Sequence, residues 1–372
     1  MARRTKDDPA AWDAFRTLCA LLAPSRSGAS VDLDAVDWDA LVRQAQDHKV
    51  NPAVWRAIEG RAGIPNPIKA YFQLLHDMSA RRNGALMEGL ATAVAQLNAR
   101  GMVPALLKGA ACVASGLYRD PAERMMLDID LLVAPDQALA CADVLRAIGY
   151  EDMHDPHQRW VAQDTHHLPP LRAPSGDFSI EVHTWLLDKE YDPMLPREAV
   201  LGRSTEQEWR GGRVRQLDPA DRVVHNIVHA QLHHQLSARG AVELRSLREL
   251  ALLVLRHGEA IDWADVARRF AAQGRGRVLS EQATQCRDLM GVALPAAERE
   301  PERVMARLRA AVARPVEVKL SPLQVLREML REYAFWFVRD PRLALNLLNP
   351  RWWPQRIRNI RDVFRRNAEH QG

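Results

Sequence analysis

Apolar residues along the first hundred positions recur every three or four residues, the spacing that places one face of a helix in a protein core. One long pattern of this kind begins after Pro65 and Pro67 and runs to Gly101, a residue type favoured just past the end of a helix. The sequence therefore predicts an N-terminal helical region over residues 1–100.

The spacing changes at Gly101, where short apolar runs begin to alternate with short helical patterns. Helical spacing returns at Asp218-Pro219, a typical helix start, and persists almost to the C-terminus. The pattern thus predicts a unit of helices and strands over residues 101–215, followed by a helical region over residues 216–372. Within that unit, strands are expected over residues 102–107, 127–133, 166–172 and 178–185, and helices over residues 110–118 and 136–148.

Two acidic residues interrupt the apolar run of the second expected strand. Side chains alternate across a strand, so Leu127, Ile129 and Leu131 face one side while Asp128 and Asp130 face the other. Two neighbouring carboxylates repel each other, and a divalent cation such as Mg²⁺, which prefers oxygen ligands, would remove that cost. The alternative is an exposed edge strand with two solvated acids.

A third carboxylate lies on the fourth expected strand. There Glu181 and His183 share one face, opposite to Ile180. On a strand next to the aspartate pair, Glu181 would complete a cluster of three acids, the kind of site that holds metal ions for phosphoryl transfer. The alternative for Glu181 is a salt bridge across the strands, for instance to Arg172.

A candidate phosphate contact precedes the aspartate pair, at the junction between the first expected strand and the helix after it. A helix start presents unpaired backbone N–H groups to a phosphate, Gly109 allows close approach of the backbone, and Lys108 adds a positive charge. Arg124 is a further candidate for contact with phosphate oxygens. The alternatives are a tight turn that needs glycine and a solvated loop arginine.

Three histidines, His225, His229 and His233, recur at four-residue spacing and would share one helical face. The zinc-protease pattern H-E-x-x-H is absent because Asn226 follows His225, so zinc is disfavoured. These imidazoles are therefore expected either to line a pocket, on a helix that packs beside the expected sheet, or to occupy ordinary surface and core positions.

Composition and charge place few further limits. Hydrophobic residues make up 47% of the chain, charged residues 26%, and the net charge is +4, which is modest for a dedicated nucleic-acid-binding protein. No apolar stretch is long enough to cross a bilayer, so we expect a cytoplasmic protein without stable membrane insertion. The four widely spaced cysteines are expected to be reduced, buried thiols. They are Cys19, Cys112, Cys141 and Cys286.

Three consecutive segments resemble one protein family, the bacterial uncharacterised nucleotidyltransferases of the polymerase-beta-like superfamily. They read Leu107-Lys108-Gly109-Ala110-Ala111, Leu117-Tyr118-Arg119-Asp120-Pro121 and Asp128-Ile129-Asp130-Leu131-Leu132-Val133. The resemblance continues through Ile180-Glu181-Val182-His183-Thr184-Trp185. Members of this family are often encoded beside lasso-peptide, exosortase or polysaccharide genes.

The resemblance implies an α+β fold, with a small mixed-sheet nucleotidyltransferase core between the two helical regions. It implies an enzyme that moves a nucleoside monophosphate (NMP) from a nucleoside triphosphate (NTP) to a hydroxyl acceptor. The resemblance does not identify the acceptor, and a peptide, a sugar, a protein and an RNA end are all open. By analogy, Mg²⁺ or Mn²⁺ is held by Asp128, Asp130 and Glu181. The implied nucleotide contacts are Lys108, Gly109, Arg124 and His183.

One departure from the superfamily leaves alternatives open. The broader superfamily has Gly-Ser at the phosphate turn, whereas Ala110 and Ala111 follow Gly109 here. A non-catalytic scaffold or regulator with the same fold is therefore one alternative. A glycosyltransferase with a D-x-D metal motif is another, and it would release a nucleoside diphosphate instead of pyrophosphate.

Overall fold

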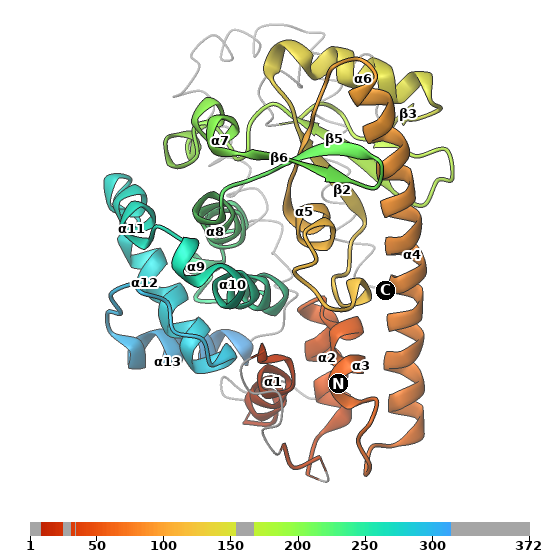
Figure 1. Cartoon of the computed structure of the whole chain (residues 1–372). Helices are drawn as coiled ribbons and strands as arrows, with labels where there is room; N and C mark the ends of the chain where they lie inside the picture. The colour runs from red at the N-terminus through yellow and green to blue at the C-terminus, as the bar shows by residue number, and fades with distance from the viewer. Residues whose placement is uncertain (1–8, 25–30, 34, 154–166, 314–372) are drawn as a thin grey trace, which may run out of the picture. The chain divides into compact units, whose positions relative to one another are not determined.

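The long helix that the sequence predicts after Pro65 is α4 (Asn66–Asn98) of the computed structural model, and it runs beside both the N-terminal helices and the sheet (Figure 1). The structure describes residues 9–24, 31–33, 35–153 and 167–313. Near its start α4 buries Phe72 in one core, and near its end it buries Leu90 and Leu97 in the other. This helix therefore ties the N-terminal helices to the sheet.

The shorter helices α1 (Pro9–Leu22), α2 (Trp38–Asp47) and α3 (Asn51–Ile58) precede α4. Asp37 caps α2, because its Oδ1 accepts a hydrogen bond of 2.9 Å from the backbone N–H of Ala40. Side-chain caps of this kind satisfy donors that the first turn of a helix leaves unpaired.

Within the described residues, seven strands form one mixed sheet in the order β3-β4-β5-β2-β1-β7-β6. β2 runs parallel to β5 and antiparallel to β1, so β2 lies near the centre of the sheet with a neighbour on each side. The strands are β1 (Ala105–Leu106), β2 (Asp128–Leu132), β3 (Glu151–Asp152), β4 (Leu171–Arg172), β5 (Ser179–His183), β6 (Thr205–Trp209) and β7 (Gly212–Gln216).

The β6–β7 hairpin is absent from the sequence-based prediction. Its strands carry mostly polar and charged side chains, so no apolar alternation marks them. The turn holds the signal that was missed: Arg210 and Gly211 both adopt positive φ, 49° and 79°, which the tight turns of two-residue hairpins require. The third expected strand is also shorter than predicted, since β4 covers only Leu171–Arg172.

Helices cover the sheet and make up most of the rest of the described chain. α5 (Lys108–Ala114) follows β1, α6 (Ala138–Ala147) follows β2, and α7 (Arg197–Arg203) follows β5. The C-terminal helices are α8 (Pro219–Val228), α9 (Leu236–Arg239), α10 (Leu244–His257), α11 (Trp263–Ala272), α12 (Gly276–Gln285) and α13 (Pro301–Val312). The expected α+β fold is confirmed.

The two faces of the sheet belong to different cores. Ile129 and Val182 pack with the C-terminal half of α4 and with α6. On the opposite face, Leu132 joins a larger core that is shared by α1–α3, α8 and α10–α13. The four cysteines are free and buried, as expected. Among the described residues, no helix combines the length and apolar character of a membrane span.

Candidate functional site

The two strands that carry the acidic residues are direct neighbours. β2 pairs with β5 in parallel register, with Asp130 opposite Glu181 and Leu132 opposite His183. Paired residues of neighbouring strands point to the same face of a sheet, so Asp130 and Glu181 project together. The predicted adjacency of these strands is confirmed.

Asp130, Glu181 and His183 form a compact group of potential metal ligands. One ligand atom from each residue lies within 4.8 Å of the others. Asp130 is 3% exposed and His183 is fully buried, whereas Glu181 is partly exposed. Glu181 Oε2 lies 3.6 Å from His183 Nε2 and 3.7 Å from His167 Nε2, so histidines are its neighbours where the sequence suggested Arg172.

His183 lies close to Asp130 and Glu181, in a position that favours its positively charged form. Its Nε2 lies 2.8 Å from Asp130 Oδ1, and its Nδ1 lies 3.2 Å from the carbonyl oxygen of Trp185. Both partners are hydrogen-bond acceptors, so both ring nitrogens must donate. Burial opposes the charged form, but the hydrogen bonds to Asp130 and Glu181 raise the pKa of His183 above its ordinary value. His183 is expected to be an imidazolium in this state.

Lys108 supplies a second cation to the same carboxylate. Its Nζ lies 2.8 Å from Asp130 Oδ1, and its side chain is 20% exposed. Burial by itself would raise the pKa of Asp130, but the Lys108 charge and the His183 hydrogen bond lower that pKa well below its ordinary value. Asp130 therefore stays ionised, with two positively charged donors on one oxygen.

Asp128 lies on the same strand but is not a member of the compact ligand group. It is exposed and lines the adjoining cavity. Partial removal from water and the negative charge of Asp130 raise the pKa of Asp128 above its ordinary value. Asp128 thus faces the site from its open side, while Asp130 forms its buried side.

The junction before α5 differs in detail from the sequence-based expectation. The helix begins at Lys108 and has only seven residues, and Lys108, not Gly109, adopts a positive φ, 44°. A Cβ on Gly109 would lie 2.8 Å from Sδ of Met126 and 3.3 Å from Cζ of Arg124. Gly109 is therefore needed for packing against these two side chains, whatever contact it makes with a phosphate.

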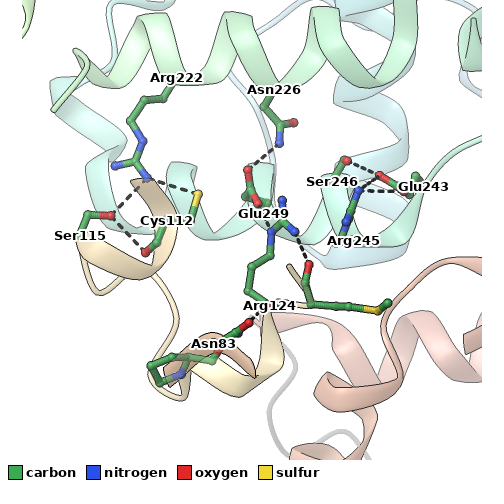
Figure 2. Close-up of polar contacts among 12 residues, drawn as sticks. Asn83, Cys112, Ser115, Arg124, Arg222, Asn226, Glu243, Arg245, Ser246 and Glu249 are labelled. Carbon is green, nitrogen blue, oxygen red and sulfur yellow. Dashed lines mark hydrogen bonds and ion pairs between the residues drawn. The ribbon is translucent and has the colours of Figure 1, made fainter. Parts of the chain in front are cut away.

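Arg124 is a buried residue engaged in an ion pair. Its Nε lies 2.8 Å from Glu249 Oε2, and its Nη1 donates to the carbonyl oxygen of Met125 at 2.7 Å. Figure 2 shows this pair, with Asn226 donating to the other oxygen of Glu249. The alternative of a solvated loop arginine does not hold. A contact between Arg124 and a phosphate would compete with Glu249 for the same guanidinium.

Asp128, Asp130 and Glu181 are called the acidic cluster below. A cavity of about 400 Å³ adjoins this cluster. One wall comes from the sheet and α5, with Lys108, Asp130 and Glu181. The opposite wall comes from α8 and α10 and includes Arg222 and Glu249. On this second wall the sequence indicated only the three spaced histidines, and Arg222 and Glu249 were not expected there because they lie far from the motif in the chain. Buried His183 does not line the cavity, which limits its direct contact with a nucleotide.

The three spaced histidines line this cavity. α8 ends at Val228 and continues as one π-helical turn over residues 229–233, so the rings stay in a row. Ring centroids are 6.1 Å apart for His225 and His229, and 5.4 Å apart for His229 and His233. Among the described residues, the potential metal-binding group contains none of them, which argues against the zinc interpretation. The pocket-lining alternative agrees with their position.

Burial keeps two of these histidines neutral, which predicts a specific pH dependence of stability. Burial and the charge of Lys108 lower the pKa of His225 to about 3 and lower that of His229 well below 6.5. The folded pKa lies below the unfolded pKa, so from pH 6.5 downward the unfolded chain binds protons that the folded chain does not. The free energy of unfolding should therefore fall with decreasing pH, by up to about 1.4 kcal/mol per pH unit for each histidine.

Urea denaturation between pH 7 and pH 5 measures this slope. The variant His225→Gln removes one titrating group and keeps a donor for the carbonyl of Leu186, which lies 3.2 Å from His225 Nε2. Its slope should be smaller than that of the wild-type protein. Above pH 6.5 His183 partly offsets the effect, because its raised pKa gives a stabilising contribution that is lost as the pH rises, so the two slopes are compared below pH 6.5. Equal slopes for both proteins would contradict the assignment.

Comparison with known proteins identifies the family. The family model described as "Uncharacterised nucleotidyltransferase" matches residues 34–291. Neither the search of curated proteins nor the search of solved structures gave a match. The match includes β2, β5 and α5, which carry the acidic cluster and Lys108, and it extends through α8 and α10, which form the opposite wall of the cavity. The chain therefore belongs to this nucleotidyltransferase family, as its motifs indicated.

Proposed function

We propose that this protein is a metal-dependent nucleotidyltransferase that moves an NMP from an NTP to a hydroxyl acceptor and releases pyrophosphate. The observation that carries the proposal is the group of Asp130, Glu181 and His183 beside a cavity, in a chain of a nucleotidyltransferase family. The tailoring of a peptide or polysaccharide would be one use of such chemistry.

The chemistry of the donor set fits a divalent cation. Carboxylate oxygens of Asp130 and Glu181 are the hard ligands that Mg²⁺ and Mn²⁺ prefer, and Asp128 offers another from the open side. His183 bridges acceptors as an imidazolium and is better suited to orienting Asp130 than to binding the ion. When bound, the ion would neutralise the charge that develops on the phosphates.

The remaining groups have the positions that NMP transfer needs. Lys108 lies where its ammonium can contact a phosphate in the cavity, and Glu181 is partly exposed at the wall. In the proposed step the acceptor hydroxyl loses its proton to Glu181, and its oxygen bonds to the α-phosphorus. The bond from that phosphorus to the bridging oxygen breaks, and pyrophosphate leaves. Such reactions depend mainly on positioning and on charge stabilisation.

Isothermal titration calorimetry with ATP, GTP, CTP and UTP, each with and without Mg²⁺, tests the proposal. The expected result is magnesium-dependent binding of at least one triphosphate. Failure of every triphosphate to bind would favour the non-catalytic scaffold, which the missing serine at the phosphate turn also favours. Once an acceptor is identified, release of a nucleoside diphosphate instead of pyrophosphate would favour a glycosyltransferase.

A further inference from the structure

The acidic cluster contains its own positive charges. Lys108 Nζ and His183 Nε2 each lie 2.8 Å from the same oxygen, Oδ1 of Asp130. With Asp128 and Glu181 counted, three carboxylates face two cations. Asp130 is therefore already neutralised by protein groups, and a divalent cation that binds to Oδ1 must displace at least one of them.

Lys108 is the group that is free to leave. His183 is fully buried, and its Nδ1 is hydrogen-bonded to the carbonyl oxygen of Trp185. Lys108 has a flexible four-carbon stem, is partly exposed and lines the cavity. Movement of its ammonium into the cavity breaks one ion pair and disturbs no backbone hydrogen bond, whereas movement of His183 would require a rearrangement of the core.

The backbone at Lys108 also favours a functional role. Its φ of 44° is in the left-handed region, which non-glycine residues adopt at an energetic cost. Gly109 is the next residue, yet the sequence places lysine at the left-handed position. Lys108 thus adopts a backbone conformation that glycine would adopt more easily, and in this conformation its side chain contacts Asp130.

We propose that the Lys108 ammonium occupies the cation position on Asp130 in the metal-free protein and leaves it for the phosphates when a metal–triphosphate complex enters. The metal and the nucleotide would then bind cooperatively. The metal replaces the Lys108 ammonium on Asp130, and the phosphates of the nucleotide accept the ammonium that has been displaced. A free divalent cation would bind weakly, because it has no phosphate to offer the displaced ammonium. This inference rests on the proposed function.

Binding of Mn²⁺ without nucleotide, followed by electron paramagnetic resonance, tests the exchange in the full chain. Lys108→Met removes the competing charge and should bind Mn²⁺ more tightly than the wild-type protein, on the order of tenfold or more, because a buried carboxylate has lost its partner. Lys108→Arg keeps the charge and should resemble the wild type.

The matched control is Lys49→Met. Lys49 also lines the cavity and also has a positive φ, 56°, but its Nζ pairs with Glu243 at 3.5 Å. Its Mn²⁺ affinity should be unchanged. Equal Mn²⁺ affinities for the wild type and Lys108→Met, or an equal gain in Lys108→Arg and Lys108→Met, would overturn the proposal.

A second measurement needs no variant and covers the case in which Lys108→Met does not fold. The wild-type protein should bind Mn²⁺ together with an α,β-methylene NTP analogue much more tightly than it binds Mn²⁺ alone. Mn²⁺ binding that is equally tight with and without the analogue would overturn the exchange. Absence of any analogue binding would instead contradict the proposed function, and a gain of Mn²⁺ affinity in Lys108→Met would then still support the competition.

Discussion

Asp130→Asn is expected to weaken magnesium-dependent NTP binding and NMP transfer together, by on the order of 3 kcal/mol, or roughly 100-fold. Asparagine keeps the shape of the side chain but removes the charge that faces Lys108 and His183. Its amide oxygen can still accept from these two donors, but it offers them no negative charge. Calorimetry with the preferred NTP and Mg²⁺, and pyrophosphate release once an acceptor is known, measure the two effects.

The matched control is Asp136→Asn. Asp136 follows β2 closely in the chain, is exposed and lies outside the acidic cluster. This variant should bind magnesium and nucleotide as the wild type does. Full NTP binding and turnover by Asp130→Asn, in a sample with a normal far-ultraviolet circular dichroism spectrum, would show that the metal assignment is wrong.

Arg124→Met is expected to lower the free energy of unfolding by about 3–5 kcal/mol, because it leaves Glu249 as a buried and unpaired charge. Arg124 and Glu249 are 8% and 6% exposed. The pair joins the segment before β2 to α10, two parts of the chain that are 125 residues apart (Figure 2). Urea denaturation at pH 7 measures the change.

Two variants serve as controls for this loss. The double variant Arg124→Met with Glu249→Leu removes both charges and should recover a large part of the stability. Arg146→Met breaks an exposed pair, in which Nη2 of Arg146 lies 2.9 Å from Oδ1 of Asp152, and should cost less than about 1 kcal/mol. If Arg124→Met cost no more than Arg146→Met, Arg124 would not be a structural link, and its role as a phosphate ligand would gain support.

Much of the fold could be predicted because it depends on local spacing. The alternation of apolar and acidic residues in β2 and β5 follows from the two-residue period of a strand, and the 33 residues of α4 carry the period of a helix. The β6–β7 hairpin escaped prediction because its strands are polar, so no buried face marked them. The division of the chain at residues 100 and 215 remains a prediction.

The sequence by itself determined the family, the residues of the acidic motif and the faces to which they point, because each is a property of neighbouring residues. Only the tertiary structure decided the state of these residues. It brought Lys108 and His183 onto one oxygen of Asp130, left Asp128 at the open side and buried Arg124 against Glu249. Charges that are distant in the chain interact strongly only after folding removes the water between them, and residue spacing carries no record of that.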